Sequence, residues 1–238
     1  SAETSTARPD GSTSRWRRDA GAGREIAGTV VLTSGFAAQG KVQFDRARIS
    51  GDFDCAGARL DGGTGIAFSA ARMEIGGGLF LRGGFTAHGP VHLFGAQIGG
   101  SWDCGGGSFT NPTGGETIWA SGARIQGSVY FERGFTSLGS IRMRGAQIIG
   151  NLSGCGGRFS NPGQVAFRAV NLTVEATSCW TGGGRQHVVP RARSASSGPG
   201  SAGWSMPGSP PSPTGRAGAQ LRRSRDRRKC FAGQRVHC

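Results

Sequence analysis

Apolar residues occur in pairs separated by one residue through the middle of this chain, and successive pairs follow at steps of five or six residues. Residues 42–60 show the pattern plainly, with the pairs Val42/Phe44, Ala47/Ile49, Phe53/Cys55 and Ala58/Leu60. Side chains two apart on extended backbone point the same way, so each pair predicts a very short strand facing one core. The rest of each step is only long enough for a corner, and we expect four corners to close one coil.

Coils of two alternating kinds repeat along the chain. One kind occupies residues 42–60, 91–109 and 141–159, and the other occupies 68–85 and 118–135, with partial matches at 26–36 and 165–174. Stacking the copies predicts an interior column made of Ile49, Ile75, Ile98, Ile125 and Ile148. The NP dipeptides at 111–112 and 161–162 predict longer outward loops in every second coil.

The middle residues of the second pairs are all polar while their neighbours are apolar: Arg48, Glu74, Gln97, Arg124, Gln147 and Asn171. This alternation is typical of a half-buried strand. A helix is excluded because the apolar residues do not recur at intervals of three and four, and a β-sandwich would need longer strands.

The stretch from about 26 to 180 resembles the pentapeptide-repeat proteins, a likeness carried by VHLFGAQI, IRMRGAQI and VAFRAVNL. That resemblance implies a right-handed, four-sided β-helix. The segments GARI, GAQI and NLTVE also make the chain similar to long actinobacterial repeat proteins labelled membrane-associated oxidoreductases, which implies a redox activity. No cofactor motif accompanies this second likeness, and we expect no bound cofactor.

We therefore predict an all-β fold, a right-handed quadrilateral parallel β-helix (solenoid) of about six coils over residues 26–180. Residues 1–25 are predicted to be disordered or to form a partial coil. Residues 181–238 are predicted to be a disordered tail rich in Gly, Pro, Ser and Arg, because they contain too few apolar residues to form a core. The decay of the repeat after Leu172 is also consistent with an out-of-frame reading of GC-rich DNA.

The net charge of +14 belongs mainly to that tail. The formal charge is +1 over residues 1–25, +3 over 26–180 and +10 over 181–238. A positive solenoid argues against mimicry of DNA, which needs an acidic surface. The tail could contact nucleic acid non-specifically through Arg222, Arg223, Arg225, Arg227, Arg228 and Lys229.

The spacing of the cysteines and histidines predicts no metal site. Cys55, Cys104 and Cys155 are expected at one inward corner of alternate coils, about 9.6 Å apart at the strand spacing, and are interpreted as buried free thiols. Free thiols fit a reducing compartment, and with no run of 18 apolar residues to span a membrane we expect a cytoplasmic protein. His88 and His92 are interpreted as solvent histidines near a corner.

One surface column alternates acid with aromatic: Asp54, Phe80, Asp103 and Tyr130, the middle residues of the third pairs. Carboxylates and aromatic rings on one face of a β-helix are suited to binding a polysaccharide, and two carboxylates about 9.6 Å apart approach the spacing of an inverting glycosidase pair. No Arg or Lys of that face clearly completes a site. We therefore treat these four residues as a candidate ligand face.

The favoured function is a non-enzymatic scaffold that binds a protein partner along a flat face or by its ends. Neither end has a recognisable cap, so self-association through the coil ends is also expected. The alternatives are an oxidoreductase, a polysaccharide-binding β-helix and non-specific nucleic-acid binding by the tail.

Overall fold

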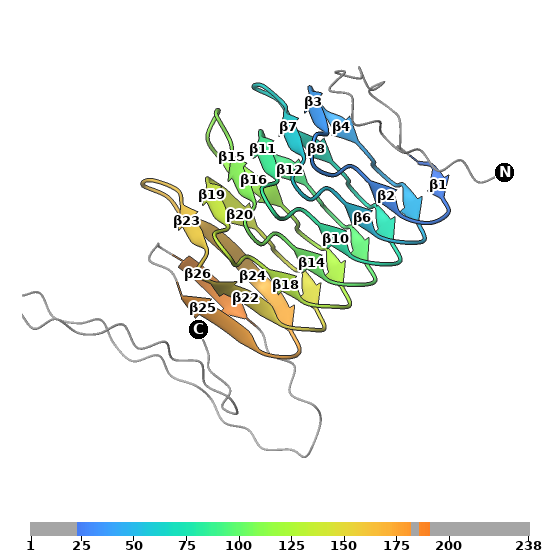
Figure 1. The fold of residues 1–238 in the computed structure, drawn as a ribbon. Helices are drawn as coiled ribbons and strands as arrows, with labels where there is room; N and C mark the ends of the chain where they lie inside the picture. The colour runs from blue at the N-terminus through green and yellow to red at the C-terminus, as the bar shows by residue number, and fades with distance from the viewer. Residues whose placement is uncertain (1–22, 182–185, 191–238) are drawn as a thin grey trace, which may run out of the picture. The chain divides into compact units, whose positions relative to one another are not determined.

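The computed structural model describes residues 23–181 together with the backbone of 186–190 (Figure 1). The regular secondary structure in that part consists of β-strands alone. These strands form a parallel solenoid of about six turns, as predicted. The strands belong to four ladders, which we name faces A, B, C and D in the order in which the chain visits them. Each coil therefore crosses four faces and turns four corners.

Faces A and B begin each coil. Face A contains β1 (Glu25–Ile26), β5 (Arg48–Ile49), β9 (Glu74–Ile75), β13 (Gln97–Ile98), β17 (Arg124–Ile125), β21 (Gln147–Ile148) and the end of β24 (Phe167–Val174). Face B contains β2 (Val30–Val31), β6 (Phe53–Asp54), β10 (Leu79–Phe80), β14 (Trp102–Asp103), β18 (Val129–Tyr130), β22 (Leu152–Cys155) and β25 (Ser178–Thr181).

Faces C and D complete each coil. Face C contains β3 (Ala37–Gln39), β7 (Arg59–Asp61), β11 (Thr86–His88), β15 (Ser108–Thr110), β19 (Thr136–Leu138) and β23 (Arg158–Ser160). Face D contains β4 (Val42–Gln43), β8 (Phe68–Ser69), β12 (Val91–His92), β16 (Glu116–Trp119), β20 (Ser140–Arg142), the start of β24 and β26 (Gln186–Pro190). Strand β26 falls within the residues that the sequence assigns to the tail.

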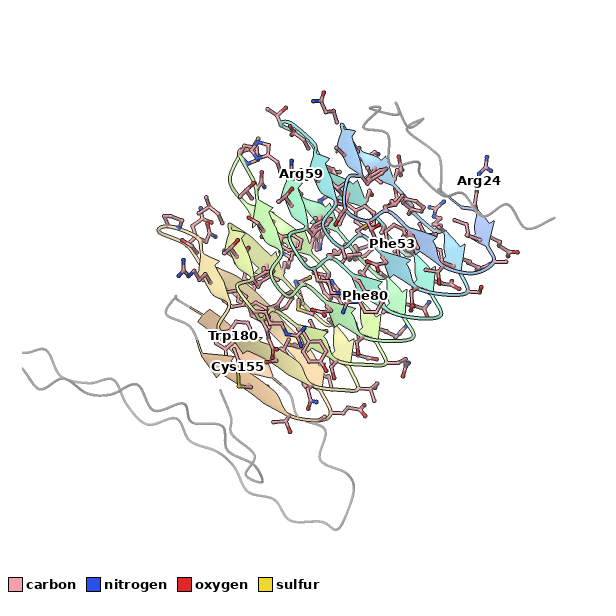
Figure 2. The ribbon with its side chains drawn as sticks, in the orientation of Figure 1. Arg24, Phe53, Arg59, Phe80, Cys155 and Trp180 are labelled. Atoms are coloured by element: carbon pink, nitrogen blue, oxygen red, sulfur yellow. A yellow bond between two sulfur atoms is a disulfide. The ribbon has the colours of Figure 1, made fainter. Side chains whose placement is uncertain are left out.

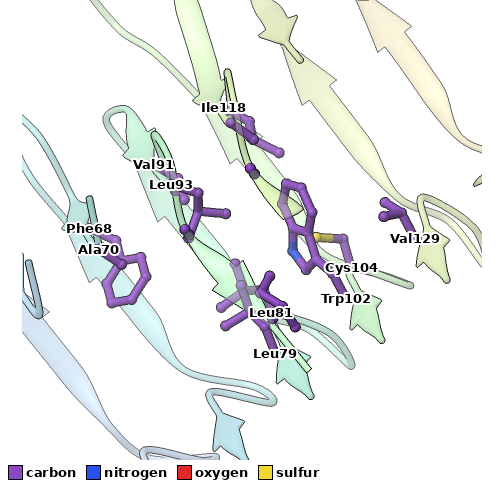
Figure 3. Packing of buried hydrophobic residues seen from close by; sticks show 14 of the residues in the cluster. Phe68, Ala70, Leu79, Leu81, Val91, Leu93, Trp102, Cys104, Ile118 and Val129 are labelled. Atoms are coloured by element: carbon purple, nitrogen blue, oxygen red, sulfur yellow. The ribbon is translucent and has the colours of Figure 1, made fainter. Parts of the chain in front are cut away.

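The predicted isoleucine column is confirmed by the strand register on face A. Ile49 pairs with Ile75, and the pairing continues without a shift to the last member: Ile98, Ile125 and Ile148. Side chains from the other faces fill the same interior, as Figure 3 shows for Leu79 and Trp102 of face B with Val91 and Ile118 of face D. The alternation of inward and outward residues thus produces one continuous core.

The corner between faces D and A requires a left-handed residue in every coil. Gly95, Gly122 and Gly145 occupy it in three consecutive coils, with φ between 64° and 67°. Arg46 and Arg72 occupy it in the two preceding coils with φ of 59° and 55°, although left-handed backbone is unfavourable for residues with a Cβ.

The corner between faces A and B is made of stacked glycines. Each amide donates to the carbonyl of the glycine one coil earlier, at 2.7–3.0 Å, through Gly28, Gly51, Gly77, Gly100, Gly127 and Gly150. A Cβ on Gly100 would lie 2.8 Å from Gly78 N and 2.9 Å from Gly77 C. Side chains are therefore excluded from this edge by the backbone of the neighbouring coil.

The longer loops lie at the corner between faces C and D, in every second coil as predicted. Asn111 closes one of them by donating from Nδ2 to the carbonyls of Gly114 and Glu116 at 2.6 and 2.9 Å. Asn161 donates in the same way to Val165 O at 3.1 Å in the later loop.

The C-terminal end differs from expectation in two ways. Trp180 lies over the core, with its ring centroid 4.6 Å from the rings of both Phe159 and Phe167, so this end carries a cap that the sequence does not reveal. The prediction of a free thiol at Cys155 was wrong, because Cys155 forms a disulfide with Cys179 (Figure 2).

Candidate functional site

The candidate ligand face lies on face B, where the register brings its four residues into one outward column. Asp54 pairs with Phe80, Phe80 with Asp103, and Asp103 with Tyr130. Figure 2 labels Phe80 near the middle of this column. Acid and aromatic side chains therefore alternate along face B as predicted, and the binding of a ligand there stays a prediction.

Both carboxylates of the column hold the corner that follows them. Asp54 Oδ1 accepts a hydrogen bond from the Ala56 amide at 2.8 Å, and Asp103 Oδ1 accepts one from the Gly105 amide at 2.8 Å. Asp103 is only 7% exposed. These are the local side-chain to backbone bonds by which Asp stabilises turns. The geometry explains both carboxylates as parts of the corner without any ligand.

An arginine on the same face was missed in the sequence. Arg82 donates to Asp103 Oδ2 at 3.1 Å, and its guanidinium lies 4.4 Å from the centre of the Phe80 ring. The position of Arg82, two residues after Phe80, could have identified it, because a side chain at that corner reaches the next coil. Face B therefore carries a cation that the sequence analysis did not assign to it, and whether Arg82 completes a ligand site stays a prediction.

A second cluster of side chains lies on face D, and the sequence did not point to it. Its rings are His92, Phe94 and Trp119, with centroids 5.3 Å apart for His92–Trp119 and 5.9 Å for Phe94–Trp119. The guanidinium of Arg142 lies 5.7 Å from the Trp119 ring centre, and that of Arg72 lies 6.0 Å from Phe94. We call these five residues the face D patch.

The face D patch combines exposed and half-buried groups. Phe94 is 41% exposed, and Arg142 forms an ion pair with Glu116. Burial lowers the pKa of His92, and the nearby Asp45 and Glu116 carboxylates oppose this effect without reversing it. The imidazole is therefore neutral at pH 7 and acts as an aromatic ring rather than as a cation.

The net positive charge of the solenoid originates around face D. This face and its corners with the neighbouring faces carry six of the twelve cations in residues 26–180, namely Lys41, Arg46, Arg72, Arg142, Arg144 and Arg168. They carry only two of the nine carboxylates, Asp45 and Glu116. The remaining faces hold six cations against seven carboxylates, so the net charge of +3 originates on face D.

Face A carries a shallow groove of about 590 Å³, and both carboxylates that line it are already paired with Arg48. Arg48 bridges Glu25 at 3.5 Å and Glu74 at 3.2 Å. Exposed ion pairs of this kind are worth at most about 1 kcal/mol. Among the described residues, Arg124 is thus the one charged group of the groove without an ion pair, and the groove lacks the aromatic rings of face D.

The thiols and histidines do not assemble a reactive centre in the described part of the chain. Cys55 and Cys104 are buried, and burial together with Asp54 and Asp103 raises the pKa of each thiol, so neither forms a thiolate at neutral pH. His88 lies on face C, apart from the face D ring of His92. No group of three His, Cys, Asp or Glu side chains there could hold a metal ion.

The chain gives no significant match to a protein-family model, to a curated protein or to a solved structure. Among the described residues, no helix is long and apolar enough to cross a membrane. The nucleic-acid contacts predicted at Arg222, Arg223, Arg225, Arg227, Arg228 and Lys229 lie outside the described residues.

Proposed function

We propose that the solenoid is a non-enzymatic scaffold that binds a protein partner through face D. The observation that carries this proposal is the face D patch, in which exposed Phe94 and half-buried Trp119 lie under two arginines. Tryptophan and arginine are the residues most enriched among those that dominate protein–protein binding energy. The chemically reactive groups, by contrast, serve the fold: Asp54 and Asp103 hold corners, and Cys55 and Cys104 are buried.

The test is photo-crosslinking from all four faces in the source cells. The photoreactive residue p-benzoylphenylalanine replaces Gln147 on face A, Tyr130 on face B, Leu138 on face C or Val170 beside face D, one position at a time. We expect one discrete protein adduct from position 170 and none from the others, and we expect Phe94→Ala, but not Phe80→Ala, to abolish it. Adducts from several faces, or from none, would contradict a scaffold with a dedicated face.

A polysaccharide-binding function for face B is the second candidate, favoured by two half-buried rings of that face, Tyr130 and Phe80, the latter in contact with Arg82. Because the carboxylates hold corners, their removal would disturb the fold, and the informative variants are Phe80→Ala and Tyr130→Ala. Loss of binding to a glycan array in both variants would support this function. Unchanged glycan binding would exclude it.

The likeness to pentapeptide-repeat proteins and to proteins labelled oxidoreductases remains a resemblance in sequence. A redox function predicts a bound flavin or nicotinamide, and we expect the purified protein to show neither in its absorbance spectrum. Binding of nucleic acid by the tail predicts a steep salt dependence, which deletion of residues 191–238 would remove.

A further inference from the structure

We infer that the partner surface recognised by the face D patch is an acidic peptide segment, whose carboxylates pair with Arg72, Arg144 and Arg168. This inference rests on the proposed scaffold function and specifies the chemistry of its partner. It follows from three observations: unpaired guanidiniums, ring faces that are already occupied, and an arginine in a strained corner.

The first observation is that face D displays arginines with unused pairing capacity. Arg72, Arg144 and Arg168 are exposed, and none of them forms an ion pair with a carboxylate in the described residues. Register places Arg168 directly beside Arg142, and Arg142 beside Trp119. Strand neighbours lie about 4.8 Å apart, so Trp119, Arg142 and Arg168 form a row of adjacent strand positions on face D. Such a row favours a ligand carrying several carboxylates, because Arg binds carboxylate in a bidentate geometry.

The second observation concerns which anionic ligand fits. A single-stranded nucleic acid binds by stacking its bases on open aromatic faces. Here Arg142 lies over the Trp119 ring and Arg72 over Phe94, and the rings also contact one another. A guanidinium thus already lies over each of these two rings, where a base would stack. What remains available is ring edges and guanidinium donors, which suits carboxylates and small apolar side chains of a peptide.

The third observation is that Arg72 holds a position that glycine fills in the next three coils. Its backbone is left-handed, at φ 55°. Its side chain runs along the following coil, because a Cβ on Gly95 would lie 3.5 Å from Arg72 Cγ. Arg72 thus lies alongside Gly95 and reaches Phe94 of the following coil. Arg46 and Arg133 share this left-handed geometry. What distinguishes Arg72 is the contact of its guanidinium with the exposed Phe94 ring.

The test measures binding of a fluorescein-labelled peptide of alternating Glu and Gly by anisotropy, with the full-length chain. An equal-length Gln–Gly peptide controls for backbone binding, and fluorescein-labelled oligo(dT) competes as the nucleic-acid probe. We expect Arg72→Gly to weaken affinity for the acidic peptide about threefold to fivefold, as for one exposed charge pair. We expect Phe94→Ala to weaken it by a similar or larger factor. The Tm of Arg72→Gly should stay unchanged or rise by a few degrees, since glycine relieves the corner.

The matched control is Arg133→Gly, which removes the same charge from another left-handed residue, at φ 52°. Arg133 lies between faces B and C, so it shares no face with the patch, and the variant should bind like the wild type. Equal losses in Arg72→Gly and Arg133→Gly would show attraction by net charge and overturn the inference. Failure to bind the acidic peptide, or tighter binding of oligo(dT) that Arg72→Gly weakens, would overturn it as well.

Failure of this inference can be distinguished from failure of the scaffold function. A protein adduct from position 170 whose yield is undiminished in Arg72→Gly would refute an acidic segment while the scaffold function stands. Absence of an adduct from all four crosslinking positions would refute the scaffold function itself.

Discussion

Individual carboxylates in this chain act mainly as hydrogen-bond acceptors for backbone and neighbouring coils. Asp103 accepts from the Gly105 amide and from Arg82, and Asp45 accepts from Ser69 and from the Ala71 amide. Asp52 accepts from the Gly78 amide of the next coil at 2.6 Å. At the scale of single residues, these carboxylate side chains therefore stabilise the corners of the solenoid by accepting hydrogen bonds.

Replacement of Asp103 by Ala should destabilise the solenoid strongly. The variant leaves the buried Gly105 amide without its acceptor and removes the partner of Arg82, for which about 1–3 kcal/mol is expected. Asp54→Ala loses one half-buried bond and should cost about 1 kcal/mol. Midpoints of urea unfolding measure both changes, and equal costs would contradict the difference in burial.

Asp45 should make stability depend on acid pH. Burial acts to raise the pKa of Asp45, but hydrogen bonds from Ser69, the Ala71 amide and Gln43 outweigh it, so the folded pKa lies below the ordinary 3.8. A depressed folded pKa stabilises the fold fully above the unfolded pKa, and this contribution is lost as pH falls below about 3.8. Asp45→Asn should therefore flatten part of the acid limb of a Tm-against-pH curve. An unchanged limb would contradict this assignment.

At the scale of the elements, the four corners obey different rules. The corner between faces D and A needs left-handed backbone but leaves open space, as at Gly122, where an added Cβ meets nothing within 4 Å. The corner between faces A and B has the opposite character, because its glycines touch the backbone of the neighbouring coil. Two glycines of similar sequence context are therefore required for different physical reasons.

These rules predict unequal effects for two alanine substitutions. Gly122→Ala should cost about 1–2 kcal/mol, the price of left-handed backbone for one residue. Gly100→Ala must push two coils apart and should cost more than that or prevent folding. Thermal unfolding followed by circular dichroism compares them, and a milder effect for Gly100→Ala would contradict the stacked-glycine corner.

At the scale of the whole solenoid, the disulfide between Cys155 and Cys179 ties strand β25 to β22 beneath the Trp180 cap. The bridge closes a loop with a sequence separation of 24 residues, for which chain entropy gives a stabilisation of about 3 kcal/mol. Cys179→Ala should therefore lower the Tm and speed hydrogen exchange in β25 and β22 first. Cys55→Ala is the control outside the bridge, and unchanged exchange in β25 of Cys179→Ala would refute this role.

The architecture could be predicted from the sequence because inward residues repeat at a spacing that only stacked coils satisfy. The isoleucines of face A follow that spacing without a shift. The prediction of a buried free thiol at Cys155 was wrong because Gly154, not Cys155, occupies the position that corresponds to Cys55. The Cys155 thiol is therefore displaced by one residue from the interior column.

The face D patch could not be found from local sequence, because Arg72, Phe94, Trp119 and Arg142 come from four consecutive coils. Comparing the middle residues of the first apolar pairs across coils would have indicated the patch, because His92, Trp119 and Arg142 occupy that position in three consecutive coils. On face B the column itself was predicted. The corner bonds of Asp54 and Asp103 depend on backbone direction, which the pattern of residue types does not specify.

The contrast between two edges of the solenoid determines where new sequence can enter the chain. The glycine edge between faces A and B has no room even for a methyl group, whereas the edge between faces C and D already accommodates the loops closed by Asn111 and Asn161. An epitope or a fluorescent reporter spliced after residue 113 would project into solvent and leave the coils in register. The same reporter spliced at residue 100 would sever the stack, so gene duplication and protein engineering can lengthen this chain at the edge between faces C and D but not at the glycine edge.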